Sequence, residues 1–143
     1  HDMVAPSGGG GERSMKLAVS TIGERSVNYI NAHGTSTPAG DVTEVEAVRR
    51  VFTDKHQPVI SSTKSLTGHS LGATGVQEAI YSLIMLDRDF ITASANISEL
   101  DPALNANEIA TKRIDNAGLD TVLSNSFGFG GTNASLAMSK YNG

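Results

Sequence analysis

The sequence contains no cysteine and no tryptophan, and only 5% of its 143 residues are aromatic. Without cysteine the chain has no disulfide, no thiolate metal site and no cysteine nucleophile of its own, which is typical of a cytoplasmic protein. The scarcity of aromatic residues argues against a surface that stacks nucleic-acid bases. No apolar run approaches the roughly 18 residues of a membrane-spanning helix, so we expect no membrane partner.

Positive charge is also scarce. Eleven Lys and Arg residues stand against 15 Asp and Glu residues, which gives a net charge of −4. Nucleic-acid binding needs a clustered basic face, so we expect no nucleic-acid partner. The hydrophobic content of 38% is nevertheless enough for one domain with a core.

Apolar periodicity predicts helices and strands in alternation. After a flexible Ser/Gly stretch at 7–11, we expect helices around 15–22, 38–52 and 72–87, and strands at 27–30, 58–60, 121–127 and 132–141. Residues 94–106 are expected to form a loop. Apolar residues cover more than one face of the 72–87 helix, which predicts a central and largely buried helix. The alternation is typical of a layered α/β domain.

Three segments carry chemically informative residues. His33 lies in Asn31-Ala-His-Gly-Thr-Ser-Thr37, His69 ends Ser61-Ser-Thr-Lys-Ser-Leu-Thr-Gly-His69, and glycines surround two phenylalanines in Asn125-Ser-Phe-Gly-Phe-Gly-Gly-Thr-Asn133. Neutral imidazole N–H groups stabilise the negative oxygen of an enolate where water is excluded. The place of His69 just before a long helix favours its neutral form. Together the segments predict the lining of an acyl-transfer site.

Each segment also has a simpler interpretation. Either histidine alone is more often structural than catalytic, and the glycine-rich segment is equally typical of a hairpin with core aromatics. His56 is expected to be solvated. Ser70 in Gly-His-Ser-Leu-Gly matches a nucleophile elbow, but it follows a polar segment and no histidine comes after it, which argues against a serine hydrolase. A zinc site on the two histidines lacks a third ligand at the usual spacing.

Several blocks, in this order and spacing, resemble the C-terminal part of the β-ketoacyl-acyl-carrier-protein synthases, nearest to the synthase I type. The blocks are Met3–Gly8, Asn31–Pro38, Ser62–Lys64, Thr67–Ala73, Gln77–Tyr81 and Ser124–Asn133. The resemblance implies an α/β, thiolase-like fold with a layered α-β-α-β-α architecture. Residues 1–143 would belong to its C-terminal half, as a domain that is incomplete at its N-terminal side. Residues 67–87 are then the helix buried between the two sheets.

The resemblance also implies a reaction, the decarboxylative Claisen condensation of an acyl thioester with malonyl-acyl-carrier protein in fatty-acid synthesis. His33 and His69 would bind the malonyl thioester carbonyl and stabilise the enolate. Lys64 would orient the two histidine loops relative to each other through Glu44. Asp41 is an alternative partner for Lys64 on the side of the first histidine loop.

Further roles follow from the same resemblance. Thr35 and Thr37 would bind the phosphopantetheine arm, Phe127 would gate entry of the second substrate, and the Phe129 backbone N–H would donate to the oxyanion. No cofactor is required, because phosphopantetheine arrives on the acyl carrier protein. A structural Na⁺ or K⁺ is implied near five residues: Asn31, Ala32, Glu78, Ser124 and Asn125.

The nucleophilic cysteine of this family lies in the preceding half of the enzyme. We therefore expect that half and the acyl carrier protein as partners, a homodimer for the whole enzyme, an exposed apolar surface on this chain, and no condensation by the chain alone. One alternative is a non-condensing relative that decarboxylates or sets chain length. The other is a carrier-protein-binding module, with Lys112 and Arg113 in a local docking patch.

Overall fold

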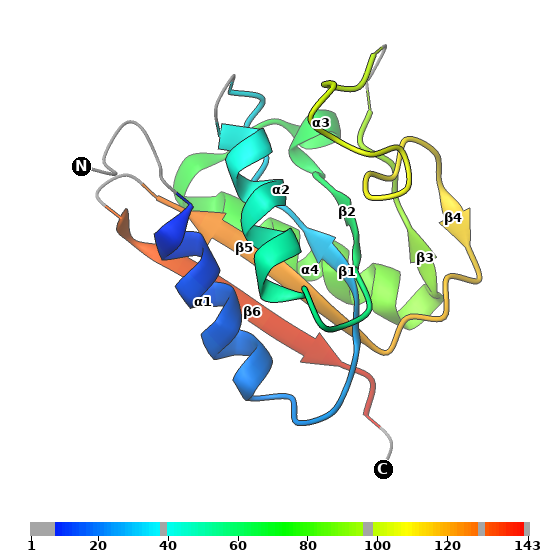
Figure 1. Cartoon of the computed structure of the whole chain (residues 1–143). Coiled ribbons are helices and arrows are strands. Elements are labelled where there is room, and N and C mark those ends of the chain that lie inside the picture. Colours follow the sequence, from blue (N-terminus) through cyan, green and yellow to red (C-terminus); the bar gives the residue numbers. More distant parts are fainter. Residues whose placement is uncertain (1–7, 38–39, 96–98, 129–130, 142–143) are drawn as a thin grey trace.

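The computed structural model describes residues 8–37, 40–95, 99–128 and 131–141. A four-stranded sheet lies at its centre, in the order β2-β1-β5-β6 (Figure 1). The strands are β1 Val27–Asn31, β2 Val59–Ser61, β5 Thr121–Phe127 and β6 Asn133–Ser139. Strand β1 runs parallel to both β2 and β5, whereas β6 is antiparallel to β5.

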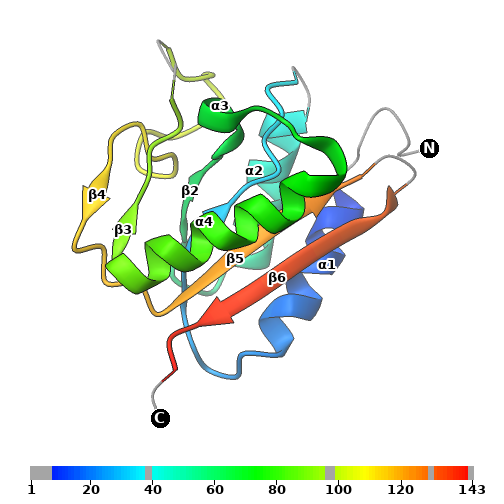
Figure 2. The ribbon, with the colours of Figure 1, turned by 180° about the vertical axis from the view of Figure 1, so that it is seen from behind.

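Helices cover both faces of this sheet. Helices α1 (Gly9–Ser20) and α2 (Gly40–Val51) pack on one face, and α4 (Thr74–Arg88) packs on the other, as the two opposite views show (Figures 1 and 2). The core under α1 and α2 includes Met15, Val48 and Phe52, which are almost completely buried. The predicted α/β layering is confirmed as three layers.

The beginning of α1 contradicts the sequence prediction. We expected a flexible glycine stretch at 7–11, but Gly9, Gly10 and Gly11 form the first turn of the helix. A Cβ atom on Gly11 would lie 2.8 Å from the ring of Phe127, so the helix approaches β5 too closely for any side chain there. Close packing, rather than flexibility, explains Gly11, and an added Cβ on Gly10 would also meet the Asn133 side chain. Ser7 lies outside the described residues.

Helix α4 differs from its prediction in start and in burial. It begins at Thr74 rather than Gly72, after the short helix α3 (Lys64–Thr67) and the 3₁₀ turn η1 (Leu71–Ala73). The expectation of a largely buried helix is wrong for this chain, because the side chains of Val76, Ile80 and Leu83 are 65%, 49% and 49% exposed. Only one face of α4 meets the sheet, and nothing among the described residues covers the other.

The 94–106 segment contains no helix or strand among its described residues, as expected. A small antiparallel pair, β3 (Phe90–Ile91) and β4 (Ile114–Asp115), was not predicted, because two residues are too few to show alternation. Strand β6 is shorter at both ends than the predicted 132–141. No helix within the described part of the chain is long and apolar enough to cross a membrane.

Candidate active site

The topology brings the predicted segments to one edge of the sheet. Strands β1, β2 and β5 are parallel, so their carboxyl ends lie at the same edge, where ligands of open α/β sheets usually bind. The ring centroids of His33 and His69 are 5.8 Å apart with an edge-to-face geometry. The Phe127 ring lies 5.9 Å from His33. Residues separated by up to 94 positions in the sequence therefore form one cluster.

His33 is held as a neutral ring. Burial, together with the positive charge of Lys64 and the nearby His69, lowers the pKa of His33 to about 4. Its Nδ1 is buried and has no hydrogen-bond partner among the described residues. At neutral pH the ring therefore carries one N–H group and no charge, as the enolate hypothesis requires.

Glu44 fixes the loop that carries His33. Its carboxylate, on α2, accepts the backbone N–H of His33 at 2.9 Å and that of Gly34 at 3.0 Å. The side-chain amide of Asn125 donates to the same carboxylate at 3.3 Å. Burial raises the pKa of Glu44, although these hydrogen bonds oppose that rise. The Glu44 carboxylate holds the histidine loop by itself, whereas the resemblance implied that Lys64 orients the loops through Glu44.

Lys64 pairs instead with Glu78, so both predicted partners, Glu44 and Asp41, are wrong. The Lys64 ammonium contacts the Glu78 carboxylate, and the two side chains are only 5% and 2% exposed. Burial raises the pKa of Glu78, while Lys64 opposes the rise. The pair connects α3, next to the second histidine loop, with the sheet-facing side of α4.

His69 has a defined tautomer. The backbone N–H of Leu71 donates to its Nδ1 at 3.1 Å, and the Thr74 hydroxyl lies 2.9 Å from the same nitrogen. Since Nδ1 accepts a hydrogen bond, it carries no proton, and the neutral ring carries its hydrogen on Nε2. No hydrogen-bond partner of Nε2 occurs among the described residues, so its N–H is available to a ligand there. The importance of Thr74 was not predicted, because a threonine at a helix start is usually only a cap.

The loop after β1 contains the residues predicted to bind a substrate arm. Thr35 is half-buried and Thr37 is exposed. Asp41 accepts the Ser36 backbone N–H at 3.2 Å, and burial raises the pKa of Asp41 while N–H groups of this loop lower it. Contacts of the two threonines with phosphopantetheine remain a prediction. Phe129, the predicted oxyanion donor, lies outside the described residues.

The structure gives no support for a hydrolase or a zinc site. Ser70 follows the short helix α3, not a strand, and is exposed, so the elbow geometry is absent. His56 is exposed, as expected. No group of three His, Asp or Glu side chains able to hold a metal ion occurs in the described ranges.

The predicted monovalent cation is a separate question, because its ligands would be mainly amide and backbone oxygens. The Asn31 side-chain oxygen already accepts the Thr63 backbone N–H at 3.3 Å, and that of Asn125 accepts the Ser135 hydroxyl at 2.8 Å. Among the described residues, Glu78 Oε2 is buried without a partner. Each of these amide oxygens has a second lone pair, so the hydrogen bonds do not decide whether a cation binds, and the cation remains a prediction.

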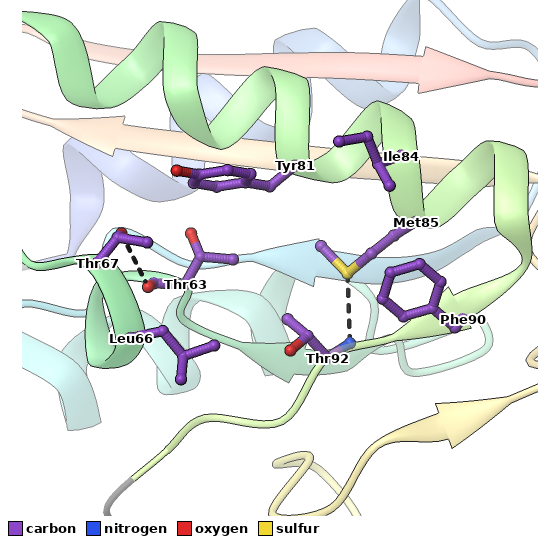
Figure 3. A pocket seen from close by; sticks show the side chains of 8 residues that line it. All are labelled: Thr63, Leu66, Thr67, Tyr81, Ile84, Met85, Phe90 and Thr92. Carbon is purple, nitrogen blue, oxygen red and sulfur yellow. Dashed lines mark hydrogen bonds between the residues drawn. The ribbon is translucent and has the colours of Figure 1, made fainter.

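A pocket lies apart from the histidine cluster. This pocket, of about 190 Å³, is enclosed by α3, α4 and the segment after β3 (Figure 3). Its lining is mostly apolar and contains none of the predicted site residues: Thr63, Leu66, Thr67, Tyr81, Ile84, Met85, Phe90 and Thr92. Figure 3 shows the Tyr81 ring and the Met85 side chain facing α3 and Thr92 across this space.

Comparison with known proteins places this fold and site in a class. The family described as "Beta-ketoacyl synthase, C-terminal domain" matches residues 1–98, and the chain belongs to that family. Within it, the chain is 61% identical over 143 residues to 3-oxoacyl-[acyl-carrier-protein] synthase 1 of Haemophilus influenzae. That match includes 100% of this chain and 35% of the relative. The chain thus spans about a third of the length of the relative.

Solved ketosynthases have the same fold. A β-ketoacyl synthase from Burkholderia phymatum superimposes with a TM-score of 0.86 at 36% identity, over 98% of this chain and 34% of that one. A ketosynthase solved in complex with its acyl carrier protein, from a type II polyketide synthase, superimposes with a TM-score of 0.80 at 28% identity, over 92% and 33%. The predicted thiolase-like fold is confirmed.

Proposed function

We propose that this chain supplies the histidine pair of a 3-oxoacyl-acyl-carrier-protein synthase. In this reaction a malonyl thioester loses CO₂, and the electron pair of the broken C–C bond becomes an enolate. The enolate carbon attacks the carbonyl carbon of an acyl thioester and forms the new C–C bond. The C–S bond of that thioester breaks, and the thiolate that had carried the acyl group leaves. The observation that carries the proposal is the pair of imidazole rings, 5.8 Å apart, at the carboxyl edge of the sheet.

Neutral donors suit this reaction better than charged ones. An imidazolium beside the enolate would transfer a proton to it and quench the nucleophile. A neutral ring stabilises the oxygen through its N–H without giving up the proton. His69 offers Nε2–H, and His33 stays neutral near pH 7 because its pKa is lowered to about 4. One such donor typically contributes about 10²–10³ in rate.

The thiol that carries the acyl group must come from elsewhere, because this chain has no cysteine. We propose that a further part of the same enzyme supplies it, as in the family this chain belongs to. The acyl carrier protein is the proposed partner, with its phosphopantetheine arm along the Thr35–Thr37 loop. The complex of a related ketosynthase with its carrier protein supports this partner. A homodimeric enzyme in the cytoplasm completes the proposal.

A chimera tests this function. The matching 35% of the Haemophilus influenzae relative is replaced by this chain, and malonyl-carrier decarboxylation and condensation are measured separately. We expect both activities, and a loss of about 10²–10³ in decarboxylation for His33→Ala or His69→Ala. His56→Ala, which changes an exposed histidine, is the matched control. Unchanged decarboxylation in both site variants would overturn the proposal.

The same assay distinguishes the alternatives. Decarboxylation without condensation in the chimera would favour a non-condensing relative. Binding of carrier protein without either reaction would favour a binding module. The 143-residue chain alone should form no C–C bond, because it lacks the thiol, and product formation by the purified chain would contradict the assigned division of roles.

A further inference from the structure

Two donors converge on one nitrogen of His69. The backbone N–H of Leu71 is 3.1 Å from Nδ1, and Oγ1 of Thr74 is 2.9 Å from it. A backbone N–H only donates, so Nδ1 is an acceptor and carries no hydrogen. The Thr74 hydroxyl must therefore donate as well, since a bare ring nitrogen has nothing to give. Both contacts favour the same tautomer.

The position of Thr74 is fixed by the fold. It is the first residue of α4 and is only 5% exposed. The following Gly75 lies so close to β5 that an added Cβ would be 3.3 Å from the Ser126 hydroxyl. Leu71, in turn, adopts a positive φ of 52°, a conformation that side chains other than glycine rarely take. The chain thus accepts local strain in a turn that presents an N–H to the ring.

His69 itself is exposed, so packing alone does not orient its ring. We propose that Thr74 is a positioning residue for His69: its hydroxyl, with the Leu71 N–H, holds the ring in the Nε2–H tautomer and aims that N–H at the thioester oxygen. This inference rests on the proposed function and assigns the selection of the reactive tautomer to a residue outside the histidine loops.

The expected effect follows from the strength of one neutral hydrogen bond. Such a bond contributes enough to change a rate by about 2- to 12-fold. Thr74→Val keeps the shape of the side chain and removes the hydroxyl, whereas Thr74→Ser keeps the hydroxyl. In the chimera we expect Thr74→Val to lower kcat for decarboxylation by about 2- to 12-fold with KM unchanged, and Thr74→Ser to restore it.

A spectroscopic measurement separates positioning from folding. In the ¹⁵N-histidine-labelled chimera, the His69 ring nitrogens should show protonated Nε2 in wild type and a mixture of tautomers in Thr74→Val. Thr53→Val, which removes a hydroxyl bonded to the Arg49 and Arg50 carbonyls at the end of α2, is the matched control. If Thr74→Val does not fold, Thr74→Ala, which also lacks the hydroxyl, takes its place with the same expectations.

The results distinguish this inference from the proposed function. Suppose that Thr74→Val, or Thr74→Ala in its place, has the same kcat and the same His69 tautomer as wild type, while His69→Ala is still impaired. That result would overturn the inference and leave the proposed function intact. An equal loss in Thr74→Ser would also overturn it, because packing and not the hydroxyl would then matter. If His33→Ala and His69→Ala both retained full decarboxylation, the proposed function would fail, whatever the tautomer.

Discussion

The buried ion pair of Lys64 and Glu78 gives the most quantitative prediction. The two side chains are 5% and 2% exposed, and Glu78 Oε2 has no partner among the described residues. Lys64→Met removes the cation and leaves a buried carboxylate, which should lower the free energy of unfolding by about 3–5 kcal/mol. Adding Glu78→Met removes the second charge, and the double variant should lie within about 1 kcal/mol of wild type, because replacing a whole buried pair by apolar groups is often neutral.

The pH dependence provides a second, independent check. Burial raises the pKa of Glu78, and loss of Lys64 should raise this pKa further. A carboxyl group whose pKa is higher in the folded protein binds more protons in the folded state than in the unfolded state. The free energy of unfolding therefore falls as the pH rises from the pKa of the unfolded state to that of the folded state. The loss in free energy of unfolding caused by Lys64→Met, relative to wild type, should therefore be larger at pH 8 than at pH 5.

Urea denaturation of the chimera at pH 5, 6.5 and 8 measures both effects. Lys16→Met is the matched control, since Lys16 is 59% exposed and pairs with Glu12 one helical turn away, where loss of the pair should cost less than about 1 kcal/mol. A Lys64→Met deficit below about 1 kcal/mol at every pH would refute the reasoning, because it would mean that water or another cation solvates Glu78.

Three further changes test other parts of the structure. Gly11→Ala places a methyl 2.8 Å from the Phe127 ring, so we expect a loss of about 1–3 kcal/mol in urea denaturation and slower decarboxylation in the chimera. The pKa of His33 is lowered to about 4 from the ordinary value of 6.5, so the unfolded chain binds a proton at a higher pH than the folded chain, and the protein becomes less stable as the pH drops from 6.5 to 4. In thermal denaturation, His33→Gln should make the stability depend less on pH over this range. Arg49→Leu breaks the two-nitrogen contact with Glu108, so the Ala110 amide, which bonds to β2, should exchange faster by hydrogen-exchange NMR.

Local sequence predicted those elements whose surroundings agree with their local preference. The apolar segments at 27–30 and 121–127 are strands because both faces of the central sheet are covered by helices. The prediction failed at Gly9–Gly11, where local preference indicates flexibility but the chain is helical, and Gly10 and Gly11 lie close to side chains of β6 and β5. Tertiary packing decided that segment, and a sequence pattern does not show which strand a helix will approach.

The histidine pair could be predicted because each residue lies next to glycine and hydroxyl residues in a recognisable block. The partner of Lys64 could not, since Glu44 and Glu78 are both acidic residues at moderate separation and only the fold selects between them. One signal was available: Thr74, Glu78 and Ser82 recur every four residues in a helix otherwise rich in apolar residues. A polar stripe of this kind indicates a face with specific partners.

That stripe also explains why the burial of α4 was mispredicted. The helix turns its polar residues inward, where Glu78 meets Lys64 and Ser82 accepts the Asn31 amide, and leaves Val76, Ile80 and Leu83 outside. An amphipathic helix on a free surface has the opposite arrangement. The inversion is favourable where the inward polar groups are paired, as Ser82 and one carboxylate oxygen of Glu78 are. It also requires that the outward apolar groups are covered by something else. Since this chain matches only 34% of a ketosynthase structure, the proposed enzyme has ample further chain for that purpose. The inward polar residues of α4 thus hold groups of the candidate site in place. The outward apolar residues would contact further chain in the proposed enzyme.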